Sequence, residues 1–194
     1  MYYNLLNMKA LGTMASFGLL LLASCMGYKE FPVESDYSFE GEFRRYRTFN
    51  FLDTRSSGAD SSLQNNIIED AIRARMELQG YEYTTRDPRL LVSYKIFYDS
   101  LLFTGYEQPD IELFVEYENN IDQEMDPVKY NLRQGTLLVL MYDRERKKSI
   151  WQGYASGVFG NQFFSDKRYL QGAVRSIFDQ YKVFAEGFVV DRKK

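Results

Sequence analysis

The sequence predicts an α+β fold in which two helices pack on one face of a mostly antiparallel sheet of about five strands. Two segments repeat apolar residues at helical spacing, and the segments between them are apolar at every second position or throughout. Apolar residues make up 45% of the 194 positions, with 15 Phe and 16 Tyr, so one domain can build a core. The predicted order of elements is β-α-β-β-β-β-α.

The first strand and the first helix are predicted between residues 43 and 80. Residues 43–52 (FRRYRTFNFL) are rich in aromatic side chains, which favours a strand. A capping-box pattern at 61–64 (SSLQ) then predicts a helix start, and Gly80 is expected to end that helix. The apolar stripe of this helix is expected to comprise Leu63, Ile67, Ala71, Ala74 and Leu78.

Four further strands are predicted between residues 90 and 159. Every second side chain is apolar from Leu90 to Tyr98, and residues 111–117 (IELFVEY) continue this alternation. Residues 136–142 (TLLVLMY) are apolar almost throughout, which is typical of a central strand. The charged run 143–148 (DRERKK) is expected to turn the chain into a hairpin with residues 149–159.

The second helix is predicted over residues 166–184. Its stripe consists of Leu170, Ala173, Ile177, Tyr181 and Phe184. Because each helix has one stripe, both helices are expected on the same face of the sheet. Residues 39–188 are expected to form a single domain.

The N-terminus resembles the signal peptide of a bacterial lipoprotein over residues 1–24. Residues 10–24 carry no charge and are fewer than the roughly 20 that a membrane-spanning helix needs. Leu22, Ala23 and Ser24 precede Cys25 in a pattern similar to the lipobox. By this resemblance Cys25 becomes the mature N-terminus and carries a covalent lipid that attaches the protein to a membrane. No other cofactor is expected.

The residues after Cys25 are expected to link the lipid to the domain. Residues 25–38 mix proline, glycine and charges without a period, which is typical of a tether. Met26 stands where an Asp would follow the lipidated cysteine in a protein kept in the inner membrane. The expected location is therefore the cell envelope, lipid-anchored, at the outer membrane.

The composition excludes several classes of function. The chain has no histidine and one cysteine, so it lacks Ser-His, Cys-His and histidine-zinc arrangements. The net charge of −3 gives no electrostatic reason to bind nucleic acid. We therefore expect a non-enzymatic protein with no metal and no nucleic-acid partner.

Several short motifs follow one another in an order that resembles a known family. They are the lipobox, residues 46–51 (YRTFNF), 78–81 (LQGY), 87–94 (DPRLLVSY), 135–139 (GTLLV) and 150–155 (IWQGYA). Over residues 36–185 the chain is similar to the domain-of-unknown-function family 4136, lipoproteins of the Gram-negative envelope. Arg89 departs from the family, which usually has an acid before its Leu-Leu-Val strand. The resemblance implies a fold and an envelope location, but no activity and no site residues.

Acidic residues form two candidate sites. Residues 122–126 (DQEMD) begin like an EF-hand loop, but Pro127 and Arg133 occupy the positions of its glycine and its last glutamate, so a solvated loop is favoured. On a strand at 111–117, acidic side chains would lie in one row. Two of these carboxylates could work as a catalytic acid and base. The favoured alternative is that the row forms the solvent-exposed face of a sheet. Its members are Asp110, Glu112, Glu116 and Glu118.

Basic and aromatic residues give the remaining candidates. Arg44, Arg45 and Arg47, together with residues 144–148, are interpreted as exposed charges at strand edges. Trp151 and Tyr154 are the candidate ligand or partner contacts, because their amphipathic rings lie near Gly153 and suit a small pocket or a protein surface. For Trp151 the favoured alternative is a core position with its indole N–H bonded to the backbone.

Three functions remain open at this point. The leading expectation is a non-enzymatic envelope lipoprotein that binds a partner or supports assembly at the membrane. The alternative is a carrier that holds a lipid or other apolar ligand between helices and sheet, which requires an apolar cavity of roughly several hundred Å³. A hydrolase acting through Glu112 and Glu116 ranks last.

Overall fold

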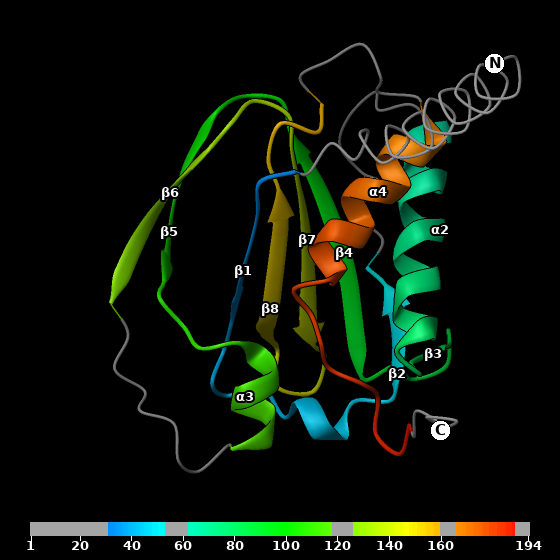
Figure 1. Cartoon of the computed structure of the whole chain (residues 1–194). Helices are drawn as coiled ribbons and strands as arrows, with labels where there is room; N and C mark the ends of the chain where they lie inside the picture. The colour runs from blue at the N-terminus through cyan, green and yellow to red at the C-terminus, as the bar shows by residue number, and fades with distance from the viewer. Residues whose placement is uncertain (1–30, 53–61, 118–125, 160–165, 189–194) are drawn as a thin grey trace, which may run out of the picture. The chain divides into compact units, whose positions relative to one another are not determined.

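The computed structural model of the protein describes residues 31–52, 62–117, 126–159 and 166–188 (Figure 1). The predictions for Cys25, Leu22, Ala23 and Ser24 lie outside these residues, as do those for Ser61 and residues 122–125. Within the described ranges, no helix has the length and apolar character needed to cross a bilayer.

The largest element is a mixed sheet of six strands. In spatial order these are β1 (Val33–Tyr37), β8 (Lys148–Ala155), β7 (Thr136–Asp143), β4 (Leu90–Phe97), β2 (Thr48–Phe51) and β3 (Glu82–Tyr83). The first four strands pair antiparallel, whereas β2 runs parallel to both β4 and β3. Parallel pairing follows from the crossover helix, because a strand that leaves the sheet through a helix returns in the same direction.

Two helices, α2 (Ser62–Leu78) and α4 (Lys167–Phe178), lie together on one face of this sheet (Figure 1). This confirms the predicted α+β class and the shared helical face. Gly80 has a φ of +85°, as expected for the residue that ends α2. The Asp166 carboxylate accepts the backbone N–H groups of Arg168 and Tyr169 at the start of α4.

The core of the domain consists largely of aromatic and other bulky apolar side chains. The largest side chains with less than 2% exposure are Trp151, Tyr46, Tyr81, Tyr154, Tyr181, Phe43, Phe49, Phe114, Phe178, Ile68, Ile72 and Met76. Trp151 packs against Phe178 and Tyr181 with ring centroids 5.9 and 5.0 Å away. These rings occupy much of the space between the helices and the sheet, which disfavours the alternative of a lipid carrier with a cavity there.

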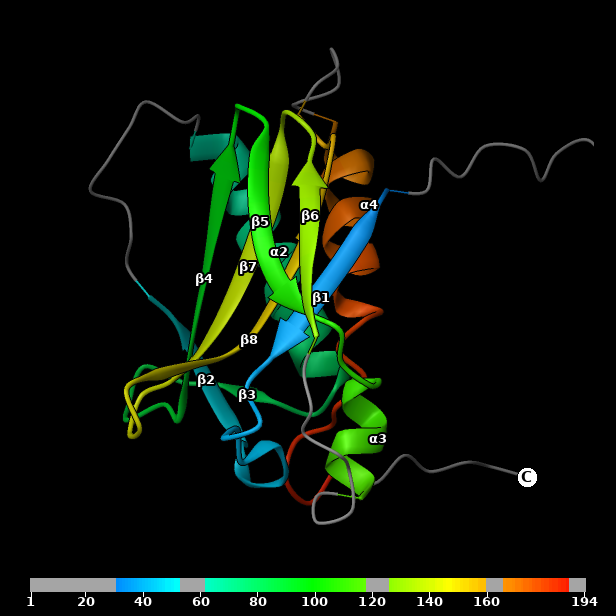
Figure 2. The same ribbon diagram turned by 90° about the vertical axis from the view of Figure 1, so that its left-hand side faces the viewer.

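A second, two-stranded sheet lies over the opposite face, which was not predicted (Figure 2). It consists of β5 (Leu101–Tyr106) paired antiparallel with β6 (Pro127–Leu132). Phe103 of β5 and Tyr130 of β6 both contact Tyr154 of β8. The outward side of β5 is also apolar, with Leu102 71% exposed, so the alternation that marks a strand is hidden in the sequence.

The predicted strand at 111–117 is wrong. Residues Ile111–Glu116 form a short helix, α3, which buries Ile111 and Phe114. The spacing of three between these residues fits a helical turn. Apolar residues at 111, 113 and 115 fit a strand equally well, and contacts with Tyr37 and Phe43 decide in favour of the helix.

Two boundaries also differ from the predictions. Phe43–Arg45 forms a 3-10 turn, η2, so the strand predicted from residue 43 begins at Thr48. The predicted tether through residue 38 is wrong, because Val33–Tyr37 pairs with β8 along the edge of the sheet. In this strand Tyr37 is buried on the helical face, and that burial holds β1 in place.

The helical stripes are confirmed in part. In α2, Ile67 and Ala71 are buried as predicted, whereas Leu63, Ala74 and Leu78 are exposed, and the most deeply buried row is Ile68, Ile72 and Met76 at a spacing of four. In the second helix, Leu170, Ala173 and Ile177 are buried as predicted. The second helix ends at Phe178 rather than 184, and the chain continues without helical structure. Tyr181 remains in the core beyond the helix, whereas Phe184 is 46% exposed.

Candidate functional site

A groove of about 340 Å³ lies between η2, α3 and the segment that follows α4. It opens to solvent and combines apolar walls with charges of both signs. The lining residues are Arg44, Glu112, Val115, Lys182, Val183, Phe184, Ala185, Glu186, Gly187 and Phe188. A volume near the lower end of the roughly 300–1,000 Å³ typical of ligand sites suits one or two side chains of a partner.

The segment after α4 forms one wall. Tyr181, Val183 and Ala185 are buried, and the residues between them are exposed, as in an extended chain with one face on the core. Backbone hydrogen bonds fix this segment, from Ala185 N to Gln79 O and from Glu186 N to Tyr46 O, each at 2.9 Å. The core contacts therefore force the intervening side chains towards the groove and solvent.

Two exposed rings result from this arrangement. Phe184 and Phe188 are 46% and 42% exposed and stack with centroids 5.7 Å apart and planes at 14°. Leu113 of α3 and Tyr117, which directly follows α3, are 46% and 51% exposed. Clustered exposed rings of this kind are typical of binding surfaces rather than of an isolated folded surface.

Arg44 connects η2 with α3 at the opposite wall. Its Nε donates to Val115 O at 2.7 Å, and its second guanidinium nitrogen donates to Glu116 O at 3.2 Å. These carbonyls belong to the C-terminal end of α3, where a cation is favourable. On the other wall Lys182 Nζ lies 4.0 Å from Asp110 Oδ2. The groove thus has a positioned cation and apolar rings, which suits an amphipathic partner.

The predicted row of acidic residues does not exist as a strand face. Glu112 and Glu116 lie four residues apart on α3, and Glu112 alone of this pair lines the groove. Two carboxyl groups on one short helix do not face each other across a cleft, as a glycosidase mechanism requires. Glu118 lies outside the described residues. Among those described, no group of three or more acidic, histidine or cysteine side chains is placed to hold a metal ion.

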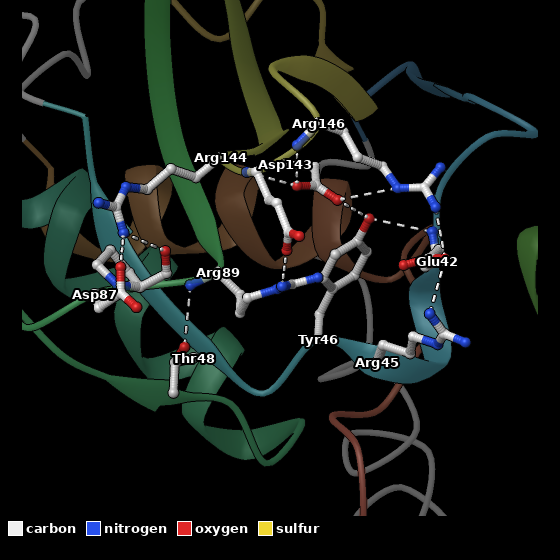
Figure 3. Close-up of polar contacts among 11 residues, drawn as sticks. Glu42, Arg45, Tyr46, Thr48, Asp87, Arg89, Asp143, Arg144 and Arg146 are labelled. Atoms are coloured by element: carbon white, nitrogen blue, oxygen red, sulfur yellow. Dashed lines mark hydrogen bonds and ion pairs between the residues drawn. The ribbon is translucent and has the colours of Figure 1, made fainter.

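A separate polar cluster joins η2 to the hairpin between β7 and β8 (Figure 3). At its centre the Tyr46 hydroxyl donates to Asp143 Oδ2 at 2.7 Å, and both side chains have 0% exposure. Asp143 Oδ1 accepts the backbone N–H groups of Glu145 and Arg146, each at 2.9 Å. Burial and the hydrogen bond to Asp143 raise the pKa of the Tyr46 hydroxyl far above its usual value, so it remains a donor.

Exposed ion pairs surround this buried centre. Arg146 reaches Glu42 at 2.6 Å, and Glu42 also pairs with Arg45 at 3.0 Å. Arg144 pairs with Asp87, and Arg89 with Glu145 (Figure 3). Each pair is exposed and contributes little alone. The buried hydrogen bonds hold the hairpin, and the cluster is a structural anchor. The basic residues of this cluster pair with nearby acidic side chains.

The structure separates the two predicted contact residues and buries both. Trp151 faces the helices and Tyr154 faces the two-stranded sheet, and each is 1% exposed. Trp151 occupies the core, which is the favoured alternative, but among the described residues its indole N–H has no hydrogen-bond partner, contrary to the expected backbone bond. The Tyr154 hydroxyl likewise has no partner within the described ranges.

Of the groove residues, sequence reasoning singled out only Glu112 as a candidate for a site. Phe184 was placed on a helical stripe, and Arg44 among edge charges. For Phe184 the sequence does carry a signal. Apolar residues at every second position, Tyr181, Val183 and Ala185, fit an extended segment better than a further helical turn.

Comparison with known structures shows similarity in fold. A PDZ domain protein from Parabacteroides distasonis is 14% identical with a TM-score of 0.50, and the match covers 78% of this chain and 35% of that chain. The chain thus spans about a third of that protein. At this identity the likeness shows a shared fold only.

Two crystal structures of the PelC dodecamer from Paraburkholderia phytofirmans are more distant. They are 7% and 9% identical, with TM-scores of 0.42 and 0.41. The matches cover 78% and 76% of this chain and 96% and 95% of those chains. Scores at this level carry no argument.

Comparison with curated proteins found no match. The family comparison is decisive, because the description "Domain of unknown function (DUF4136)" matches residues 33–181, from the first residue of β1 to the buried Tyr181. This range is more than half of the 194 residues, and the chain therefore belongs to the DUF4136 family.

Proposed function

We propose that the protein is a lipid-anchored envelope lipoprotein whose DUF4136 domain is a non-enzymatic module for binding a partner protein. The observation that carries the binding role is the groove with its stacked, exposed Phe184 and Phe188. Its occupant is an amphipathic segment of the partner, with apolar side chains against these rings and polar groups beside Arg44 and Lys182.

The anchoring role is supported by the lipobox pattern before Cys25. Phe31 packs against Tyr169 near the start of α4, with ring centroids 5.0 Å apart. The six residues from Cys25 to Phe31 span at most roughly 20 Å, however they are arranged. A lipid on Cys25 therefore keeps the beginning of β1 close to the membrane surface.

The position of α3 relates the groove to β1. Tyr37, at the far end of β1, contacts Phe114 of α3 at 5.1 Å between ring centroids. The groove thus lies near the end of β1 that is farther from Val33 (Figure 1).

Anchoring is tested with the variant Cys25→Ser in cells supplied with a clickable fatty acid. The wild-type chain is expected to incorporate the label and to sediment with outer membranes, because a thioether-linked lipid is stable to extraction. The variant is expected to lose both properties. Labelled, membrane-bound Cys25→Ser protein would contradict the anchoring proposal.

Partner binding is tested with a photo-crosslinking amino acid at Phe184, compared with the same residue at Leu102. Both positions are exposed, but Leu102 lies on the two-stranded sheet, outside the groove. A discrete adduct from Phe184 and none from Leu102 is expected in intact envelopes. Equal labelling at both positions, or no adduct at Phe184, would contradict binding through the groove.

A further inference from the structure

An acidic and aromatic cluster lies between the edge of the six-stranded sheet and the two-stranded sheet. Glu34 and Asp36 alternate along β1 and therefore point to the same face. The register places Glu34 opposite Tyr154 and Asp36 opposite Gln152. These four side chains consequently share the face that β5 and β6 cover, away from α2 and α4 (Figure 2).

Aromatic rings from the two-stranded sheet complete the cluster. Phe103 and Tyr130 meet the Tyr154 ring edge to face, with centroids 5.5 and 6.0 Å away. A Cβ placed on Gly105 would lie 3.4 Å from Asp36 Oδ2, so the Asp36 carboxylate borders β5 closely. We call Glu34, Asp36, Tyr130 and Tyr154 the acidic–aromatic cluster.

The polar groups of this cluster are incompletely satisfied. Tyr154 is 1% exposed, and its hydroxyl has no hydrogen-bond partner in the part of the chain that the structure describes. A buried hydroxyl without a partner is destabilising, and binding a ligand is one reason to retain one. Burial raises the pKa of this hydroxyl, and Tyr130, Glu34 and Asp36 raise it further.

The carboxylates also lack positive partners. Neither Glu34 nor Asp36 has an ion pair among the described residues, and Gln152 Nε2 donates to Asp36 Oδ2 at 3.4 Å. Burial raises the pKa of both carboxyl groups. Glu107, which follows β5, adds a third negative charge beside Tyr130. Lys129 precedes Tyr130 on β6 and points to the opposite, outer side.

We propose that the acidic–aromatic cluster binds an alkylammonium group. Such a cation pairs with Glu34 and Asp36, donates a hydrogen bond to the Tyr154 hydroxyl oxygen and lies against the face of Tyr130. Glu34 is exposed, and Asp36 and Tyr130 are half-buried, so the ligand enters from the solvent side of β1. This site lies on the face of the sheet away from α2 and α4, and it does not depend on the proposed role of the groove.

The direct test uses the full-length chain in neutral detergent, titrated calorimetrically with n-butylammonium chloride. Sodium chloride at equal ionic strength and 1-butanol are the controls for charge and for the alkyl chain. Saturable binding of butylammonium, with none of butanol, is expected at pH 7.5. Binding should weaken as the pH falls towards 4.5, because protonation removes the two negative charges. Absence of saturable binding, or equal binding of butanol, would overturn the proposal.

Variants locate the binding. Asp36→Asn is expected to weaken the affinity about tenfold, and Tyr154→Phe about threefold to tenfold, because each removes one polar contact with the cation. Glu77→Gln, the same charge change on the exposed side of α2, is expected to bind like the wild type. Because the Tyr154 hydroxyl has no partner, Tyr154→Phe should unfold at the wild-type denaturant concentration. Unchanged affinity in Asp36→Asn would refute the site.

Further arms identify the source of the cation. Spermidine represents a free polyamine, and an acetylated, amidated lysine peptide represents a polypeptide side chain. Tighter binding of either one supports the proposal and names its source. Calcium chloride tests a metal site at the same carboxylates: saturable calcium binding without butylammonium binding would overturn the proposal.

Discussion

The hydrogen bond between Tyr46 and Asp143 should be a large single contribution to the stability of the domain. Tyr46→Phe removes the hydroxyl that donates to Asp143 Oδ2 at 2.7 Å and accepts from Glu42 N at 3.1 Å. Asp143 has 0% exposure, so water cannot replace this donor. The nearest remaining cation on Oδ2 is Arg146 Nε at 3.9 Å, beyond hydrogen-bond range.

A hydrogen bond to a charged group contributes about 1.5–3 kcal/mol, and leaving a buried charge short of a donor adds to the loss. We expect Tyr46→Phe to lower the free energy of unfolding by about 2–3 kcal/mol. For a domain of this size, that change corresponds to a decrease in Tm of about 4–12 °C.

The matched control is Tyr154→Phe, which removes a hydroxyl from an equally buried tyrosine. Because the Tyr154 hydroxyl has no hydrogen-bond partner, its removal should leave the free energy of unfolding unchanged within about 0.5 kcal/mol or raise it slightly. Urea denaturation can be followed by the fluorescence of Trp151, the single tryptophan, which is 1% exposed. Equal decreases in the urea midpoint for the two variants would refute the reasoning.

Three further predictions concern packing, the groove and pH. Gly153→Ala should destabilise the domain by about 1–3 kcal/mol, because the new Cβ would lie 2.5 Å from the Trp151 ring. Gly172→Ala, in α4, should stabilise the domain by about 0.5–1 kcal/mol, because its Cβ would lie 3.9 Å from the nearest atom, on Phe31. Thermal melts that rank the two variants the other way would contradict this prediction. Arg44→Ala should speed amide hydrogen exchange in α3 and leave α2 unchanged, because it removes both donors to the end of α3; unchanged exchange in α3 would show that the contacts contribute nothing. Burial raises the folded-state pKa of Asp36, so the folded state binds more protons and its contribution to stability falls as the pH rises through that pKa. Asp36→Asn should therefore become relatively more stable than the wild type between pH 4 and pH 7 in urea titrations, and a constant difference would exclude the effect.

Elements with one strong periodicity were predictable from the sequence. The strand from Leu90 and the apolar strand 136–142 are present, since each must bury one face or both faces in any compact fold. The helix that ends before Gly80 is present as well, because a left-handed φ at a glycine ends a helix locally. The two strands and the helix were predictable because local sequence patterns specify them.

The failures occurred where local patterns were ambiguous. Residues 111–117 fit a strand and a helix equally well, and burial of Phe114 against Tyr37 selects the helix. Residues 33–37 were assigned to a tether because they include charges. Pairing with β8 makes these residues a strand, and it places Glu34 and Asp36 on one face of the sheet and Tyr37 on the other.

Taken alone, the sequence determined the α+β class, the shared face of the two helices and the absence of histidine chemistry. It also predicts the lipid on Cys25, since a peptidase reads that signal as a linear segment. Only the tertiary structure decided which residues meet across the fold. The groove brings together residues 44, 112 and 184, and the acidic–aromatic cluster joins residues 34, 36, 130 and 154. Such contacts depend on strand order and on the burial of Tyr181 beyond α4, which no local periodicity encodes.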